Sequence, residues 1–181
     1  MVAPWRSPLA RSLHQHRRLP HSRYLQLATV APNGEPANRT VVFRGFAAES
    51  DDLQFVTDRR SAKIQHLQVN PRAEACWYFV ETREQYRIAG RVELVTGDDR
   101  LPLWEALSAK ARQQFAWPHP GQPRSPAEAF AVAVPAVPPE TFCGLRLCPD
   151  RVERLALRGD PQDRWYYWLG EGTWHLENWN P

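Results

Sequence analysis

Two segments that alternate apolar and polar residues flank an Asn-Gly pair near the start of the chain, and this pattern constrains the fold more than any other. Tyr24–Val30 precedes Asn33-Gly34, and Ala37–Phe46 follows it. Alternation with a period of two is typical of a strand with one buried face, and Asn-Gly is typical of a tight turn between antiparallel strands. The sequence therefore predicts a β-hairpin.

Further short apolar segments extend this hairpin into a sheet. We expect strands at Leu53–Thr57, Ala75–Val80 and Gln85–Val95, the last two joined as an antiparallel meander. Three closing strands are expected around CGLRLC, VERLAL and DRWYYWL, before TWHLENW at the end.

Three helices are predicted between these strands. AKIQHLQVN follows Ser61, a potential N-cap, and stops at Asn70-Pro71, while LPLWEALSAKARQQF is amphipathic. SPAEAFAVAV opens with Ser125, Pro126 and Glu128, the residues of a capping box with proline at the first helical position. We find no internal repeat and no linker rich in Gly or Ser. The predicted fold class is mainly β with peripheral helices, a single antiparallel barrel domain over residues 1–181.

Composition fits a folded domain, with 43% hydrophobic and 11% aromatic residues among 181. No apolar run approaches the roughly 20 residues of a membrane span, and the N-terminus lacks an apolar block, so we expect a cytoplasmic protein. The three cysteines do not form a metal-binding spacing, which favours buried free thiols. Residues 1–22 form a basic arm without acidic residues, which we interpret as a solvated helix; nucleic acid or an anionic small molecule remain possible partners of the arm.

Two arginines in NRTVVFRGF raise a question of charge. On one strand Arg39 and Arg44 would face opposite sides, which is costly unless an anion is present. The segment DRRSAK leads into a helix start, where backbone amides, Ser61 and Lys63 could form a phosphate cradle together with Arg39. Alternatively, Arg39 pairs with a carboxylate such as Glu74 or Glu93, and Lys63 is an exposed helix residue. The residues alone leave both interpretations open.

Four segments, taken in order, resemble the pyridoxamine 5′-phosphate oxidase family: NRTVVFRGF, FVTDRRSAK, NPRAEACWYF and REQYRIAGRVEL. The resemblance extends from PWRSPL to the terminal proline and is strongest to a bacterial, especially cyanobacterial, branch of FMN-binding proteins without an assigned substrate. It implies an FMN-binding split β-barrel that functions as a homodimer, with each FMN in a groove between subunits.

The resemblance also implies a set of cofactor-binding residues. Arg39 and Lys63 match the positions that hold the FMN phosphate, and Val56-Thr57 matches a Tyr-Thr pair of the family. Gln85 matches a glutamine at the flavin ring on one side of the groove, and Arg164 matches an arginine from the other subunit. The full implied set is Arg39, Thr40, Val41, Val42, Arg44, Val56, Thr57, Lys63, Gln85, Gln122 and Arg164. Without the resemblance, Gln85 reads as a cross-strand amide and Arg164 as an ion pair with Asp163.

The sequence departs from the family at the positions that contact substrate. Asp160-Pro161-Gln162 stands where oxidases of pyridoxamine phosphate have Arg-Leu-His. Their Tyr, Arg and Ser on the helix after the fifth strand correspond to Leu103, Leu107 and Ala111 here. In addition, Arg44 replaces a lysine and Leu155 a tryptophan. We therefore expect FMN but not efficient oxidation of the phosphorylated vitamer.

The leading functional hypothesis is an FMN-dependent oxidoreductase with an unknown small-molecule electron donor, in which Arg44 and Arg164 stabilise negative charge on the reduced flavin. We find no paired carboxylates, catalytic triad or metal cluster. A non-catalytic flavin- or haem-binding barrel is the alternative. A nucleic-acid-binding barrel, stacking bases on Trp77, Tyr78, Phe79 and Tyr86, is a remoter one, because adjacent aromatic residues on a strand point to opposite faces. We expect neither nucleic acid nor a membrane as a partner.

Overall fold

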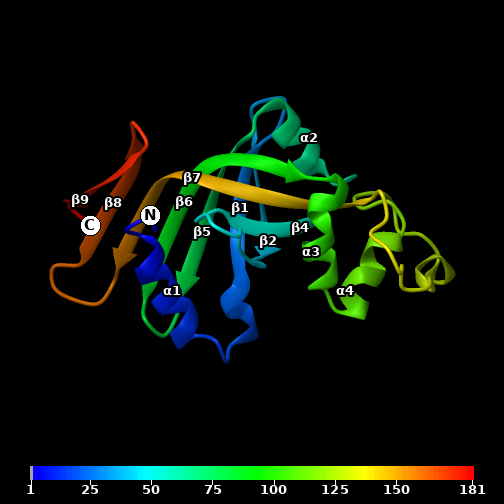
Figure 1. The fold of residues 1–181 in the computed structure, drawn as a ribbon, viewed down its shortest axis with the longest axis horizontal. Helices are drawn as coiled ribbons and strands as arrows, with labels where there is room; N and C mark the ends of the chain where they lie inside the picture. The colour runs from blue at the N-terminus through cyan, green and yellow to red at the C-terminus, as the bar shows by residue number, and fades with distance from the viewer. Residues whose placement is uncertain (1) are drawn as a thin grey trace.

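Nine strands form one antiparallel sheet in the computed structural model, which describes residues 2–181 (Figure 1). Its path runs β2-β1-β5-β6-β7-β4-β3, with β8 and β9 extending from β7. Because β2 also contacts β4, the sheet closes into an antiparallel split barrel, as predicted. The strands are β1 (Tyr24–Val30), β2 (Pro36–Val42), β3 (Gly45–Phe46), β4 (Leu53–Asp58), β5 (Arg72–Phe79), β6 (Glu84–Val95), β7 (Phe142–Ala156), β8 (Asp163–Gly170) and β9 (Thr173–Trp179).

Four short α-helices lie around the barrel: α1 (Arg6–Gln15), α2 (Ala62–Val69), α3 (Leu101–Glu105) and α4 (Ala109–Gln113). In Figure 1, α1 lies toward the end that carries β8 and β9, whereas α3 and α4 cover the opposite end. Additional 3-10 turns occur at Pro20–Arg23, Gly97–Arg100, Gln114–Ala116 and Ala127–Phe130. Within residues 2–181, no helix is long and apolar enough to cross a membrane.

The hairpin of β1 and β2 is confirmed, with Val30 opposite Pro36, but its second strand is shorter than predicted. The strand ends at Val42, and the backbone N–H of Arg44 then donates to the carbonyl of Gln54 on β4 at 2.9 Å. Gly45 supports this change of direction with a φ of 137°, a value that a glycine adopts most easily. Arg39 and Arg44 therefore do not share a strand, and the expectation of opposite strand faces was wrong.

CGLRLC and VERLAL form the single strand β7 rather than two strands. Pro149 between the two segments has no N–H to donate and would favour a break. In the structure Pro149 lies opposite Gly90, where the register between β6 and β7 shifts. A side chain on Gly90 would place its Cβ only 2.0 Å from the carbonyl oxygen of Cys148. The absent side chain at Gly90 thus lets the two backbones approach and β7 continue.

Two of the predicted helices differ from expectation. LPLWEALSAKARQQF divides at Ser108, whose Oγ accepts from the backbone N–H of Ala111 at 3.3 Å and so caps α4. SPAEAFAVAV forms only the 3-10 turn Ala127–Phe130, without a side-chain cap. β-branched valines and Pro135 follow this turn and do not support a longer helix. AKIQHLQVN forms α2 with Ser61 at its N-cap, but the Oγ of Ser61 accepts from Lys63 instead of capping a backbone amide.

The basic N-terminal arm forms α1, but its inner face is not solvated. Trp5 and Leu9 are fully buried in the main core. Ser12 Oγ donates to a carboxylate oxygen of Glu84 at 2.5 Å, and Nε2 of His16 accepts from the backbone N–H of Glu81 at 2.9 Å. Our interpretation of the arm as a solvated helix was therefore wrong for this face, although arginines do remain on its exposed face.

A second apolar cluster holds α3 and α4 against the barrel. It comprises Val95, Leu103, Trp104, Leu107, Phe115 and Phe142. The contact with β7 is close at Gly144, where a Cβ would lie 2.4 Å from Cδ1 of Leu103. Of the cysteines, Cys143 is buried while Cys76 and Cys148 are partly exposed, and all three are free thiols.

Candidate functional site

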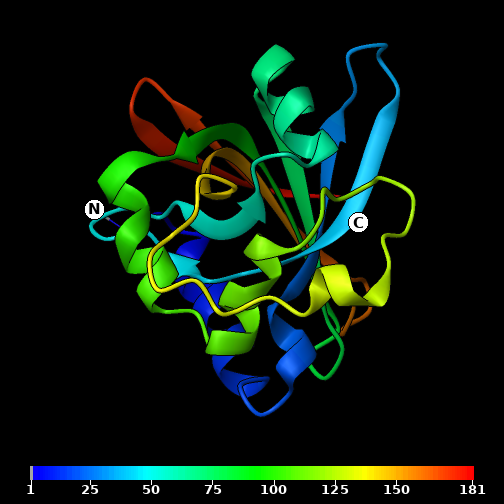
Figure 2. The ribbon, with the colours of Figure 1, turned by 90° about the vertical axis from the view of Figure 1, so that its right-hand side faces the viewer.

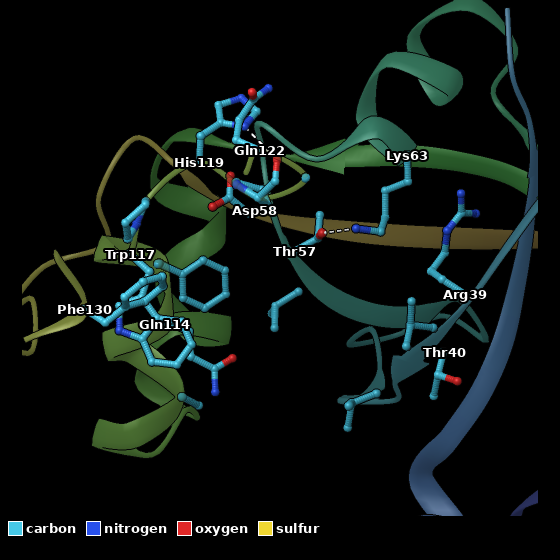
Figure 3. A pocket seen from close by; sticks show the side chains of 18 of the residues that line it. Arg39, Thr40, Thr57, Asp58, Lys63, Gln114, Trp117, His119, Gln122 and Phe130 are labelled. Carbon is cyan, nitrogen blue, oxygen red and sulfur yellow. Dashed lines mark hydrogen bonds between the residues drawn. The ribbon is translucent and has the colours of Figure 1, made fainter. Parts of the chain in front are cut away.

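A pocket of about 600 Å³ lies between the edges of the split barrel, α4 and the segment 117–130 (Figure 3). Figure 2 shows this segment crossing the end of the molecule and approaching β2. Nine of the predicted cofactor residues line the pocket, although they come from distant parts of the sequence. They are Arg39, Thr40, Val41, Val42, Arg44, Val56, Thr57, Lys63 and Gln122.

Arg39 lies at one side of the pocket without an anionic partner. Its Nη1 donates to the carbonyl oxygens of Leu27 and Ala37, both at 3.0 Å, and to Thr29 Oγ1 at 2.7 Å. The carboxylate of Glu74, considered as its partner, instead accepts from Arg87 and Arg151. Burial lowers the pKa of Arg39. The arginine is thus oriented by neutral groups and keeps its positive charge uncompensated.

Lys63 extends from α2 toward the same side as Arg39 (Figure 3). Its Nζ donates to Thr57 Oγ1 at 2.8 Å and to Ser61 Oγ at 2.9 Å, so it is not the freely exposed helix residue of the alternative interpretation. Burial, followed by the positive charge of Arg39, lowers the pKa of Lys63. Arg39 and Lys63 each disfavour the charge of the other, and neither forms a salt bridge within residues 2–181. A bound anion would stabilise both charges.

The carboxylate that borders the pocket is already neutralised. Asp58 lies at the end of β4 and accepts from Nε and Nη2 of Arg60, the latter at 2.6 Å. Arg44 adds a further positive charge to the lining, and burial together with nearby Arg23 lowers its pKa. The net charge of the pocket lining is therefore positive.

The opposite side of the pocket is aromatic, a feature that sequence reasoning missed. Phe115, Trp117 and Phe130 lie there, with the rings of Trp117 and Phe130 edge to face at 5.8 Å (Figure 3). Nη2 of Arg60 donates to the carbonyl of Trp117 at 3.0 Å and so ties this wall to β4. The signal was present in WPHPGQPR, where proline restricts the backbone around an aromatic residue.

Gln85 and Arg164 do not line this pocket. Gln85 on β6 lies opposite Leu155 on β7, which in turn lies opposite Arg164 on β8. The two residues therefore share one row across the sheet of a single chain. Along the path through β1, β5, β6 and β7, β8 is five strand steps from β2. Which subunit would contribute each of the two residues to a flavin site stays a prediction.

The alternative pairing of Arg164 with Asp163 is not observed. Arg164 donates to Glu153 at 2.5 Å rather than pairing with Asp163. Glu153 also forms a salt bridge with Arg87 at 3.5 Å, so the row continues into a network of charges on the same sheet.

The positions that hold substrate phosphate in the resembled oxidases have other tasks here. Leu103 and Leu107 are buried in the second apolar cluster, and only Ala111 reaches the pocket wall. Asp160-Pro161-Gln162 lies in the connection between β7 and β8. None of these residues can donate a charged hydrogen bond to a phosphate group.

The aromatic surface required for nucleic-acid stacking is not available. Trp77, Phe79 and Tyr86 are at most 1% exposed, and only Tyr78 of that set is exposed. The remoter hypothesis of a nucleic-acid-binding barrel is therefore wrong for these residues.

Comparison with known proteins shows the family to which the chain belongs. The sequence model of the pyridoxamine 5′-phosphate oxidase FMN-binding domain matches residues 2–96. Pyridoxine/pyridoxamine 5′-phosphate oxidase 2 from Arabidopsis thaliana is 37% identical, covering 99% of this chain and 98% of that protein. Pyridoxine/pyridoxamine 5′-phosphate oxidase from Myxococcus xanthus is 31% identical, covering 83% of this chain and 78% of that protein.

Among solved structures, a pyridoxamine 5′-phosphate oxidase-related, FMN-binding protein from Nostoc punctiforme is 48% identical, with a TM-score of 0.97 and full coverage of both chains. The split barrel and its antiparallel topology thus define a flavin-binding class of protein. The chain belongs to the pyridoxamine 5′-phosphate oxidase family and carries its FMN-binding domain, which confirms FMN as the predicted cofactor.

Proposed function

We propose that this protein is an FMN-dependent oxidoreductase that binds the FMN phosphate between Arg39 and Lys63. The observation that carries the proposal is the pair of partly buried cations that lacks any carboxylate partner within residues 2–181. The residues fit the group, because an oxyanion can accept from the unused nitrogens of Arg39 and from Lys63. Thr57 and Ser61 would supply further hydroxyl donors.

We further propose that a second copy of the chain completes each site. Gln85 and Arg164 lie on one sheet surface, where Tyr24 and Tyr78 are 48% and 45% exposed. If the surface of one chain that carries Gln85 and Arg164 packs against the pocket of its partner, both side chains would reach the flavin. They would approach it from the side opposite Arg39 and Lys63. Family membership supports this arrangement.

Bound FMN would supply the capacity to accept two electrons from a donor. The chain's own contribution is to orient the cofactor and to hold positive charge near its ring. Arg44 is suited to this in the pocket, as is Arg164 of the partner surface, although Glu153 shares its charge. The aromatic wall of Phe115, Trp117 and Phe130 excludes water from one side. We propose a donor that lacks a phosphate group, because Leu103, Leu107 and Ala111 provide no cation for one.

Arg39→Ala and Lys63→Ala test the phosphate assignment. Each variant should weaken FMN binding by about 10- to 100-fold, because a charge-assisted bond is lost while the strand or helix remains. Isothermal titration of flavin-free protein measures the affinity. Arg91→Ala removes an exposed arginine outside the pocket and is the matched control. Wild-type affinity in both site variants would contradict the assignment.

The chromophore of the purified protein separates the oxidoreductase from the binding-protein alternative. We expect a yellow protein that releases FMN, identified by mass, and whose flavin is bleached by a productive donor under anaerobic conditions. A haem absorption band would instead support a haem-binding barrel.

A further inference from the structure

A buried series of hydrogen bonds lies behind the side of the pocket that carries Arg39 and Lys63. Nη1 of Arg39 donates to Thr29 Oγ1 at 2.7 Å, and that oxygen lies 3.0 Å from Nδ1 of His66. Thr29 is 2% exposed and His66 is 9% exposed. On the buried face of β1, Thr29 follows Leu25 and Leu27, so its hydroxyl interrupts an otherwise apolar row.

The direction of the first of these hydrogen bonds is fixed. A guanidinium group only donates, so the hydroxyl of Thr29 accepts from Arg39. The hydroxyl then either donates its proton to Nδ1 of His66 or accepts from it, depending on the tautomer of the ring. In both cases Thr29 bonds Arg39 and His66 at once and links the two side chains.

The same contacts hold one edge of the guanidinium and leave the other edge open. Arg39 lies opposite Leu27 and Thr29 lies opposite Ala37, so Arg39 and Thr29 are diagonal neighbours across the hairpin. Within residues 2–181, all hydrogen bonds of the Arg39 side chain are made by Nη1. Nε and Nη2 therefore remain as the pair of donors that a phosphate could engage.

Helix α2 connects this series of hydrogen bonds to Lys63, the second cation of the pocket. Lys63 and His66 are three residues apart, so they lie on neighbouring positions of one helix face. Lys63 enters the pocket, while His66 contacts Thr29 behind it. Helix α2 thus carries one cation and, through His66 and Thr29, contacts the support of the other.

We propose that Thr29 and His66 are positioning residues, which act through Arg39 to present its free edge to the phosphate of FMN. The proposal rests on the proposed function, because it requires the phosphate to lie at Arg39. It predicts that the two residues matter for a phosphorylated flavin and not for riboflavin, which lacks the phosphate.

Thr29→Val removes the hydroxyl at nearly constant volume, and Thr29→Ser retains it. We expect the valine variant to bind FMN about tenfold more weakly, with riboflavin affinity changed by less than about twofold. The serine variant should bind FMN like the wild type, and His66→Leu should lower FMN affinity without affecting riboflavin. In an Arg39→Ala background, Thr29→Val should lower the affinity for FMN by less than about twofold, because Arg39, through which Thr29 acts, is absent. Thermal unfolding of each flavin-free variant verifies that the fold is retained.

Several results would overturn the proposal. Equal losses for FMN and riboflavin would show that Thr29 only supports the core, as would an undiminished loss in the Arg39→Ala background. Unchanged FMN affinity in Thr29→Val, with a clear loss in Arg39→Ala, would reject the positioning role and retain the proposed function. A wild-type protein that does not prefer FMN to riboflavin would reject both.

Discussion

Lys63 illustrates how a single residue can be unfavourable for the empty protein and necessary for the loaded one. Its ammonium group is partly buried beside Arg39 and is bound only by the hydroxyls of Thr57 and Ser61. Burying a charge without a counter-charge costs free energy, and an anionic phosphate would offset that cost. The site therefore carries electrostatic strain that FMN should relieve.

Lys63→Met tests this at the residue scale. We expect the free energy of unfolding of the flavin-free protein to stay equal or to rise by up to about 1 kcal/mol, while FMN affinity falls about tenfold or more. Denaturant unfolding and fluorescence titration measure the two effects. A variant that loses stability by several kcal/mol would show that the lysine is instead a structural residue.

The titration of Lys63 gives a second measurable consequence. Its pKa in the empty folded protein is lowered from 10.5 by burial and by Arg39. Between that lowered pKa and 10.5 the unfolded chain binds more protons at this residue, so Lys63 by itself contributes a rise in stability with pH in this window. The slope should be smaller in Lys63→Met, and stability that falls equally in both proteins would contradict the assignment.

At the scale of elements, α1 is held to the sheet by a buried carboxylate. Burial alone would raise the pKa of Glu84, but hydrogen bonds from Ser12 and Arg154 outweigh it and lower the pKa from 4.5. A carboxylate with a lowered pKa stabilises the fold above its ordinary pKa and loses that contribution as pH falls through the folded value.

Glu84→Gln should therefore lower the free energy of unfolding by about 1–2 kcal/mol at pH 7 and by less below pH 4. Urea unfolding at the two pH values measures the difference. Glu93→Gln, at an exposed position on the same strand whose carboxylate forms no salt bridge within residues 2–181, is the control. A loss that is equal at both pH values would mean that the charge of Glu84 is not what anchors α1.

The region of α3 and α4 bears on which substrate the protein can bind. Leu103 on α3 and Leu107 between α3 and α4 fill the second apolar cluster, so neither offers a cation to a substrate phosphate. Loss of buried charge-assisted contacts costs about 2–5 kcal/mol, or roughly 30-fold to several thousand-fold in transition-state binding. We expect the FMN-loaded protein to oxidise pyridoxamine phosphate at least that much more slowly than an efficient oxidase of the family. Assays of pyridoxal phosphate and peroxide formation decide this, and comparable turnover would contradict it.

Strand periodicity and turn residues were sufficient to predict most of the strands, whereas the cofactor residues were implied by the family resemblance. The hairpin at Asn33-Gly34 and the strands β4 to β6 follow from local patterns, which the structure retains. The split of the long helix at Ser108 and the continuity of β7 past Pro149 depend on packing against distant residues. The hydrogen bond between Thr29 and His66 could not be predicted from the sequence either, because it joins residues 37 positions apart whose types are common in cores.

At the scale of the whole molecule, the pocket and the row of Gln85 and Arg164 lie on separate parts of one sheet. Because Gln85 and Arg164 do not line the pocket of their own chain, the site that we propose needs a second copy to supply them. In the proposed dimer each site would take its phosphate cations from one chain and its ring contacts from the other.

This separation implies that two defective chains can restore each other. Mixing Arg39→Ala protein with Arg164→Ala protein and allowing the subunits to exchange should produce hybrid dimers. In each hybrid, one site carries both defects and the other carries neither. Since random exchange makes half of the dimers hybrid, about a quarter of all sites should regain wild-type FMN affinity. Titration of the unfractionated mixture measures this fraction. Hybrids isolated by tandem purification through two different tags should show wild-type affinity in half of their sites. A chain that carries both substitutions and is not mixed with another variant should have no site with wild-type FMN affinity. If purified hybrids also fail to regain this affinity, both halves of the site lie within a single subunit.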